Sequence, residues 1–180
     1  SMVAASKLYP KARVLFPGSQ ERNVREFLRE TRFPLQAERL KAFPLDQVTR
    51  LVLVDVKRIT RIGPIRDIVQ RPGLEIHIYD HHPAHPKDII GSLEVLREVG
   101  ATTTLLLDLV REQELPLTPQ EATLFALGIY EETGLLTFTN TTEADLHAVA
   151  FCLSRGANLG LVSDFIRREL TVEQVGLLNE

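Results

Sequence analysis

The sequence predicts an α/β fold in which a mostly parallel sheet is flanked by helices on both faces. Apolar runs over 51–56 and 74–79 have the length and residue types of buried strands. Four consecutive aliphatic residues at 51–54 favour a strand covered on both faces, as in parallel sheets. A short helical stretch over 64–69 lies between the two runs, and this alternation is typical of βαβ units.

Composition limits the classes of protein to consider. The chain has 180 residues, about the size of one domain, and we take 1–180 as a single domain. A net charge of -3 gives no basic field that would indicate nucleic-acid binding. One cysteine, Cys152, excludes an internal disulfide framework and fits a reducing, cytoplasmic compartment. No apolar run approaches the length of a membrane span, so no membrane partner is expected.

The remaining elements follow from turn signals and helical spacing. In the first quarter we expect a helix over 1–9, a strand over 12–16 and a helix over 19–29 that Ser19 caps. The stretch over 31–48 contains prolines and is ambiguous. After the central strands we expect an edge strand over 93–99, an extended segment over 135–139, and helices after 101, 118, 142 and 158. Two helix starts resemble capping boxes, Thr118 with Glu121 and Thr142 with Asp145. In the helix after 142 we expect Leu146, Val149, Ala150 and Leu153 to form the buried stripe.

A cluster of chemically active residues follows the strand at 74–79. Asp80, His81, His82 and Pro83 come directly after it, at the strand end where open α/β folds bind ligands. Carboxylate and neutral imidazole are ligands for manganese, iron or zinc. A loop histidine or a helix cap is the ordinary alternative for any one of these residues.

Asp55 ends the earlier strand in the same way. A carboxylate within an apolar strand is costly unless it is paired or bound to a cation, although it could instead cap the following loop. The basic residues that follow are Lys57, Arg58, Arg61 and Arg66. They could meet a phosphate, or they could form a merely solvated basic loop.

Two further candidates lie on predicted helices. Thr102 or Thr103 could cap the helix after Ala101 and offer its N-terminus to an anion, or could act as a cap alone. Glu131 and Glu132 lie in the last turn of the helix that begins after Thr118. That end of the macrodipole disfavours a carboxylate by ~0.3–1 kcal/mol, and a bound cation would reverse this penalty.

Four motifs occur one after another along the chain, and two further segments of interest lie near the N-terminus. The four are Val54-Asp55, Asp80-His81-His82-Pro83, Gly100-Ala101-Thr102-Thr103 and Gly128-Ile129-Tyr130-Glu131-Glu132-Thr133-Gly134, the last followed by Phe138-Thr139-Asn140-Thr141-Thr142. Together they resemble the DHH phosphoesterase superfamily. The segments Lys7-Leu8-Tyr9-Pro10 and Phe16-Pro17-Gly18-Ser19-Gln20 are similar to DHH domains fused to bacterial tRNA nucleotidyltransferase/poly(A) polymerase-like proteins.

The resemblance implies a largely five-stranded parallel sheet and a hydrolase that uses two divalent ions, usually Mn²⁺, with Mg²⁺ as an alternative. It implies that Asp55, His81 and Glu132 bind metal. His82 would contact the scissile phosphate, and Asp80 would orient the imidazoles. Thr102 and Thr103, in the third motif, are the expected substrate-binding residues.

The sequence departs from the family at two places. Glu132 stands where the family has aspartate, and Glu131 could compete for its role. The family's first strand and first metal-binding motif would lie before Ser1, and its second domain would lie after Glu180. We therefore expect a fragment of a larger protein with impaired activity. Ser1 is either a tag scar before a Met2 start or the point where a longer chain was cut.

Two functions remain open from the sequence. One is the metal-dependent phosphoesterase domain of an RNA-processing protein, acting on nucleotides or short oligonucleotides by direct attack of water. The other is a catalytically inactive binding or regulatory module that retains the fold. The rest of the parent chain is an expected partner, and a second copy in a homodimer is a further one.

Overall fold

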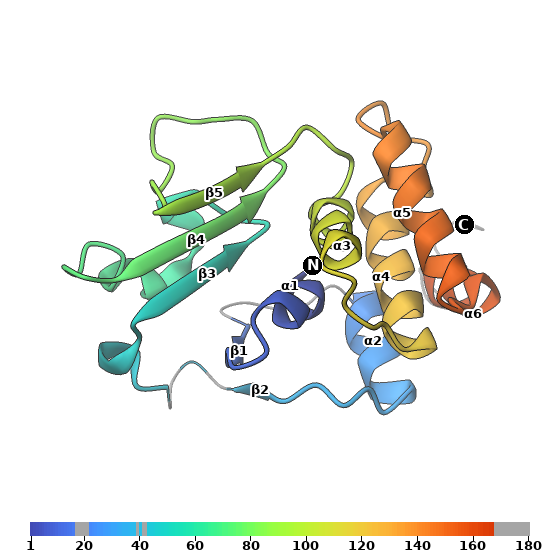
Figure 1. Ribbon diagram of the computed structural model, residues 1–180, viewed down its shortest axis with the longest axis horizontal. Coiled ribbons are helices and arrows are strands. Elements are labelled where there is room, and N and C mark those ends of the chain that lie inside the picture. Colours follow the sequence, from blue (N-terminus) through green and yellow to red (C-terminus); the bar gives the residue numbers. More distant parts are fainter. Residues whose placement is uncertain (17–21, 39, 41–42, 168–180) are drawn as a thin grey trace, which may run out of the picture.

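The computed structural model describes residues 1–16, 22–38, 40 and 43–167 (Figure 1). The helices are α1 (Met2–Leu8), α2 (Arg22–Glu30), α3 (Thr102–Glu112), α4 (Pro119–Glu132), α5 (Glu143–Ser154) and α6 (Leu159–Arg167). The strands are β1 (Val14–Leu15), β2 (Ala37–Glu38), β3 (Arg50–Val54), β4 (Glu75–Asp80) and β5 (Leu93–Leu96). Short 3₁₀ helices are η2 (Leu45–Gln47), η3 (Ile59–Arg61) and η4 (Gly63–Asp67). The Ser19 cap lies outside the described residues.

The named strands form two parallel sheets. The larger has the order β3-β4-β5, and its register places Leu53 opposite Ile78 and Tyr79 opposite Val95. The smaller pairs β1 with β2. The expected α/β class with parallel sheets is confirmed, but the expectation of one five-stranded sheet is wrong for the described strands. The short strands β1 and β2 pair with each other rather than with β3.

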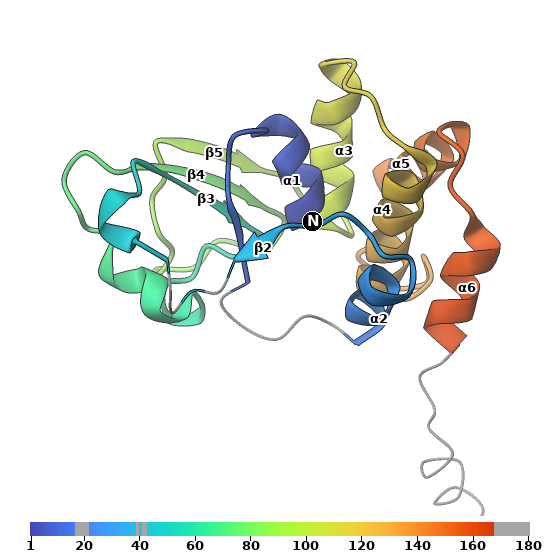
Figure 2. The ribbon, with the colours of Figure 1, turned by 90° about the horizontal axis from the view of Figure 1, so that it is seen from below.

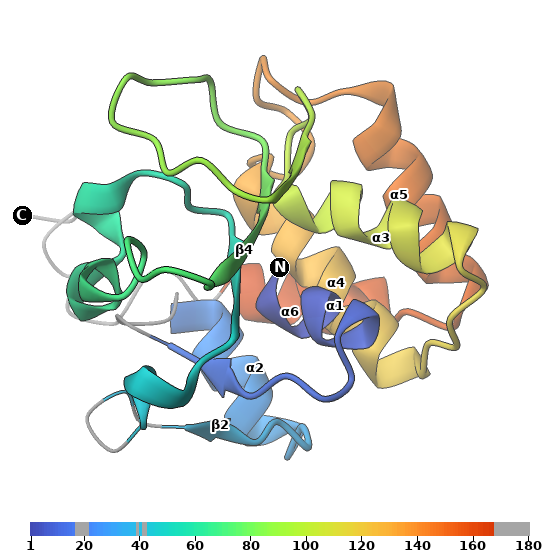
Figure 3. The same cartoon turned by 60° about the vertical axis from the view of Figure 1, so that its left-hand side comes forward.

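Helices cover both faces of the larger sheet, because alternate residues of each strand point to opposite sides. Leu53, Ile76 and Ile78 pack against Ile65 and Ile68 of the 3₁₀ region. Alternate residues on the other face, Tyr79 among them, join the cluster that contains α1 and α3. Figure 2 shows α1 and α3 between the sheet and the remaining helices, and Figure 3 shows these two helices alongside each other.

The predicted helix boundaries of α4 are confirmed. Thr118 N donates to Glu121 Oε2 at 2.8 Å, and Glu121 N donates to Thr118 Oγ1 at 3.2 Å, which completes the capping box. Gly134 follows the helix with φ 54°, a conformation that glycine adopts at least cost. A Cβ there would lie 2.2 Å from the ring of Phe138, so this turn requires glycine.

The segment over 135–139 is a turn and not the extended segment that its residue types predict. Leu135 and Leu136 both have positive φ, at 61° and 63°. Thr137 N and Phe138 N both donate to the Thr133 carbonyl oxygen, at 3.1 and 3.0 Å. These bonds satisfy a carbonyl at the end of α4, and this gain outweighs the extended preference of the segment.

The predicted buried stripe of α5 is wrong at three of its four positions, since among them only Val149 is buried. Leu146 is 53% exposed and Leu153 47% exposed, whereas Ala148 and Cys152 are buried. The inward face begins at Asp145, whose buried carboxylate fixes the rotation of the helix and directs Leu146 outward. Burial also raises the pKa of the Cys152 thiol to about 12, so the thiol stays protonated at neutral pH.

The Asp145 carboxylate joins three segments. It accepts hydrogen bonds from Gly100 N at 2.9 Å, from Thr104 Oγ1 at 2.6 Å and from Thr142 N at 2.7 Å. Burial disfavours its ionisation, but the hydrogen bonds from Thr104, Thr142 and Gly100 outweigh burial and lower its pKa. A Cβ at Gly100 would lie 2.7 Å from Asp145 Oδ2, so this junction leaves no space for a side chain at that position.

We predict that Asp145→Asn lowers the free energy of unfolding at pH 7 by about 2 kcal/mol, since hydrogen bonds to a buried charge are lost. Urea denaturation followed by circular dichroism measures this. Because the folded-state pKa is lowered, the contribution of Asp145 is complete above about pH 4 and is lost as the pH falls through the folded pKa. The wild type should therefore lose more stability on acidification than the variant.

Asp67→Asn is the matched control, since it removes an exposed carboxylate. Its effect should stay within about 0.5 kcal/mol at every pH. Equal effects of the two substitutions would show that the buried network at Asp145 does not stabilise the fold.

Candidate metal centre

The candidate ligands gather at the carboxyl ends of β3 and β4. Asp55 directly follows β3, and its backbone N still donates to the Tyr79 carbonyl oxygen of β4 at 2.8 Å. Its φ is 64°, an uncommon conformation for a residue with a side chain. The carboxylate accepts a hydrogen bond from Thr102 Oγ1 at 2.8 Å, so the start of α3 holds Asp55 in place.

His81 is held from one side and faces carboxylates on the other. Its Nδ1 lies 2.8 Å from the Val99 carbonyl oxygen, which can only accept, so Nδ1 carries the proton and donates. Its Nε2 lies 3.5 Å from Asp55 Oδ1 and 3.1 Å from Glu132 Oε1. The ring is therefore positioned with Nε2 between two carboxylates.

Asp80 and His82 form a second group beside His81. Asp80 Oδ1 accepts from the backbone N of His81 at 2.7 Å and of His82 at 3.0 Å, and lies 2.6 Å from His82 Nδ1. Asp80 is 1% exposed, whereas the His82 side chain is 42% exposed. Asp80 therefore orients only the His82 imidazole, and Val99 performs this task for His81.

Glu132 and Glu131 have different surroundings. Glu132 is the last residue of α4 and contacts His81, as described above. Glu131 Oε1 accepts a hydrogen bond from Asn23 Nδ2 at 2.5 Å. Asn23 is 5% exposed, so this contact anchors α2 on α4. Glu131 is thus engaged away from the centre and does not compete with Glu132.

The electrostatics of the centre reflect carboxylates held close together. Burial, and then the charge of Glu132, raise the pKa of Asp55 to about 6. The hydrogen bond with Glu132 raises the pKa of His81 to about 9, against the opposing effect of burial. The centre thus stabilises positive charge.

These residues fit a divalent ion. One donor atom from each of Asp55, His81 and His82 lies within 4.8 Å of the other two. With Nδ1 of His81 donating to Val99, a neutral ring directs the Nε2 lone pair at two carboxylates. A proton or a metal ion is needed between such acceptors. Imidazole nitrogen with carboxylate oxygen suits manganese, iron or zinc.

Thr102 and Thr103 do not act as the sequence predicts. The N-cap of α3 is Ala101, and both threonines lie inside the helix. They are 0% and 1% exposed, so both side chains are buried. Thr102 contributes by holding Asp55. The capping role expected for this pair is therefore wrong, and their role in substrate binding stays a prediction.

Two solved structures share this fold. An exopolyphosphatase-related protein from Bacteroides fragilis has a TM-score of 0.77 and 16% sequence identity, over 98% of this chain and 54% of that chain. A putative family II inorganic pyrophosphatase of Methanococcus jannaschii has a TM-score of 0.71 and 18% identity, over 92% of this chain and 55% of that chain.

Two curated relatives match nearly all of the chain. An A-adding tRNA nucleotidyltransferase of Geobacter sulfurreducens is 50% identical over 181 residues, which is 100% of this chain and 21% of the relative. One of Aquifex aeolicus is 35% identical over 170 residues, 94% of this chain and 19% of the relative. The chain is therefore similar to one part of an A-adding tRNA nucleotidyltransferase, and its likeness to the two solved structures is one of fold. The chain spans about one fifth of the length of the curated relatives that it matches.

No family model matches the chain. Among the residues that the structure describes, no helix has both the length and the apolar character needed to cross a membrane.

We predict that His81→Ala lowers the affinity of this domain for a divalent ion by roughly 10–100-fold without unfolding it. The ring supplies a donor atom but little of the apolar core, so its loss should affect binding more than stability. Calorimetric titration with Mn²⁺ measures the affinity, and thermal melting followed by circular dichroism measures stability.

His147→Ala is the matched control, because the His147 side chain on α5 is 65% exposed. This control should leave both the affinity for Mn²⁺ and the thermal stability unchanged. Global unfolding of His81→Ala would instead assign that histidine to the folding of the domain.

Proposed function

We propose that this domain hydrolyses phosphoester bonds in nucleotides or short oligonucleotides with the help of divalent ions, Mn²⁺ in the first place. The observation that carries the proposal is the convergence of donor atoms from Asp55, His81 and His82 within 4.8 Å. The similarity to A-adding tRNA nucleotidyltransferases supports a place within a larger RNA-processing protein in the cytoplasm.

Each residue of the centre has a distinct role in the proposal. Asp55 and His81 hold the ion, and Glu132 adds a carboxylate beside His81 Nε2. When bound, a divalent ion would supply Lewis-acid chemistry, lowering the pKa of a bound water molecule and neutralising charge on the phosphate. His82 contacts the scissile phosphate, since its ring is the more exposed of the two. Asp80 keeps that ring oriented through Nδ1.

A binding or regulatory module without catalysis is the second candidate. The grouping found among the described residues contains only Asp55, His81 and His82, enough for one ion rather than two. Glu132 lies beside His81 but outside that grouping. Hydrolysis by the two-ion chemistry of this superfamily needs more donor atoms, so this observation favours binding without turnover.

Titration with Mn²⁺ at neutral pH, combined with an assay of dinucleotide hydrolysis, distinguishes the two functions. The proposed hydrolase predicts that Mn²⁺ binds, that products appear with Mn²⁺ and not with EDTA, and that Asp55→Asn abolishes both. Binding of one ion without any hydrolysis would assign the domain to the second function. No binding at all would contradict both.

We further predict that Glu132→Asp retains Mn²⁺ binding within roughly threefold of the wild-type affinity. The shorter side chain keeps the carboxylate, and flexible coordination tolerates its displacement better than the strict octahedron of Mg²⁺ does. Glu131→Asp is the control, since Glu131 bonds to Asn23. A large loss of affinity in Glu132→Asp alone would show that the centre requires the longer side chain.

A further inference from the structure

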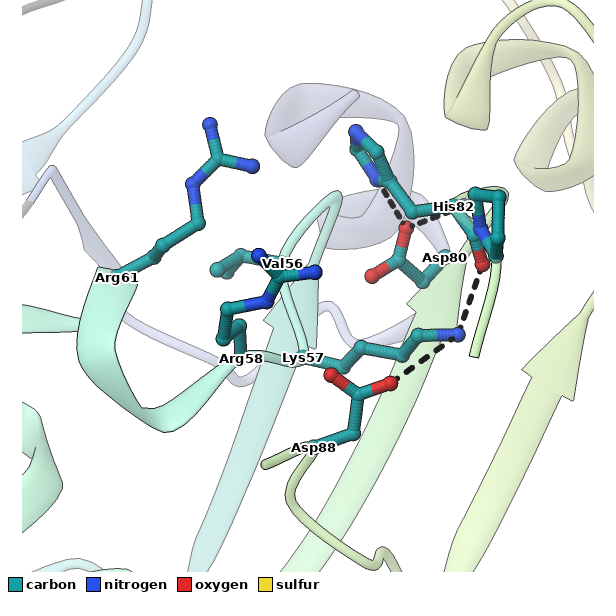
Figure 4. A pocket seen from close by; sticks show the side chains of 8 residues that line it. Val56, Lys57, Arg58, Arg61, Asp80, His82 and Asp88 are labelled. Carbon is teal, nitrogen blue, oxygen red and sulfur yellow. Dashed lines mark hydrogen bonds and ion pairs between the residues drawn. The ribbon is translucent and has the colours of Figure 1, made fainter. Parts of the chain in front are cut away.

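A small pocket lies beside the candidate metal centre and shares His82 and Asp80 with it (Figure 4). It is formed where the loop after β3 approaches the loop after β4. The polar residues that line it are Lys57, Arg58, Arg61, Asp80, His82 and Asp88. Three of them are cationic, and the role proposed above uses none of these three.

Lys57 is committed to the structure of the pocket wall. It is 6% exposed, its Nζ donates to the His82 carbonyl oxygen at 2.8 Å, and it lies 3.8 Å from Asp88 Oδ2. The backbone of the same loop is tied to the opposite loop, since Ile89 N donates to the Lys57 carbonyl oxygen at 2.8 Å. Lys57 and Asp88 therefore balance each other's charge and fix the loop that carries His82.

Arg58 and Arg61 have no such balance. Within the described part of the chain neither forms an ion pair, whereas Arg50, Arg66 and Arg97 each lie beside a carboxylate. Arg58 Nε is buried and has no hydrogen-bond partner. Such a donor costs about 1–3 kcal/mol unless something accepts from it. Two positive charges thus line the pocket without an ion pair to either of its carboxylates, Asp80 and Asp88.

Asp80 carries a hydrogen-bond acceptor that complements the unpaired Arg58 donor. Its Oδ1 accepts from the backbone of His81 and His82 and contacts the His82 ring, whereas its Oδ2 is buried without a partner. The pocket therefore contains one unsatisfied donor, Arg58 Nε, and one unsatisfied acceptor, Asp80 Oδ2. A monohydrogen phosphate carries the groups that complement both, because its oxygens accept from arginine and its P–OH donates to a carboxylate.

We propose that Arg58 and Arg61 form a phosphate-binding subsite next to the candidate metal centre. Guanidinium groups suit this task because their planar fork matches phosphate oxygens. The assignment of this phosphate to a nucleotide substrate rests on the proposed function, but the binding of the anion itself does not. In the substrate it would be a phosphate adjacent to the scissile one, which favours substrates with at least two phosphate groups.

The test is a titration of the metal-free domain with inorganic phosphate in EDTA at constant ionic strength, followed by NMR of the backbone amides. We expect saturable shifts in residues 57–61 and 82–88. The dissociation constant should rise roughly tenfold in Arg58→Gln and in Arg61→Gln, the size expected for one charge-assisted contact. Arg61→Lys should lose less than Arg61→Gln, because it keeps the charge but not the fork.

Arg66→Gln is the matched control, since it removes one positive charge from an exposed neighbour that pairs with Asp67. It should leave phosphate affinity unchanged. Equal weakening in all three glutamine variants would overturn the subsite in favour of a general charge effect, and the absence of saturable shifts in the wild type would overturn it outright. Unchanged amide spectra away from the pocket establish that each variant is folded.

This outcome is independent of the hydrolase proposal. Phosphate binding that depends on Arg58 and Arg61, in a domain that neither binds Mn²⁺ nor hydrolyses dinucleotides, would leave the subsite in place and remove the hydrolase. If hydrolysis needs Mn²⁺ but both arginine variants keep the wild-type phosphate affinity, the hydrolase would stand and the subsite would be removed.

Discussion

The buried carboxylate of Asp145 is the interaction on which the candidate centre depends. By accepting from Gly100 N and Thr104 Oγ1, it fixes the turn that begins at Val99 and leads into α3. That turn supplies the Val99 carbonyl oxygen that orients His81 and the Thr102 hydroxyl that holds Asp55. A residue that touches no candidate ligand thus determines the position of two of them, through hydrogen bonds that require its charge.

The sequence predicts well those features that rest on local chemistry. The capping box at Thr118 and the glycine after α4 involve residues a few positions apart, so their spacing is sufficient. The convergence of Asp55 with Asp80, His81 and His82 is also predictable. The carboxyl ends of neighbouring parallel strands meet at one edge of a sheet, and two apolar runs identify the strands.

Features that depend on distant partners could not be predicted in this way. Periodicity alone places Leu146 and Leu153 inside, because nothing local shows that Asp145 is buried against α3 and turns that face of α5 outward. The residue types at 102 and 103 predict helix caps, because nothing local shows that the Thr102 hydroxyl donates to the distant Asp55 carboxylate. Asn23 gives no local signal of its contact with Glu131, which lies on another helix.

The candidate ligands come from three segments far apart in the sequence, after β3, after β4 and at the end of α4. A chelate of this kind assembles only when those segments have docked, so an ion bound there would enter late in folding. Stabilisation acquired after the transition state slows unfolding and leaves the folding rate almost unchanged. The lifetime of the native state, rather than the speed of reaching it, would then depend on the supply of divalent ions.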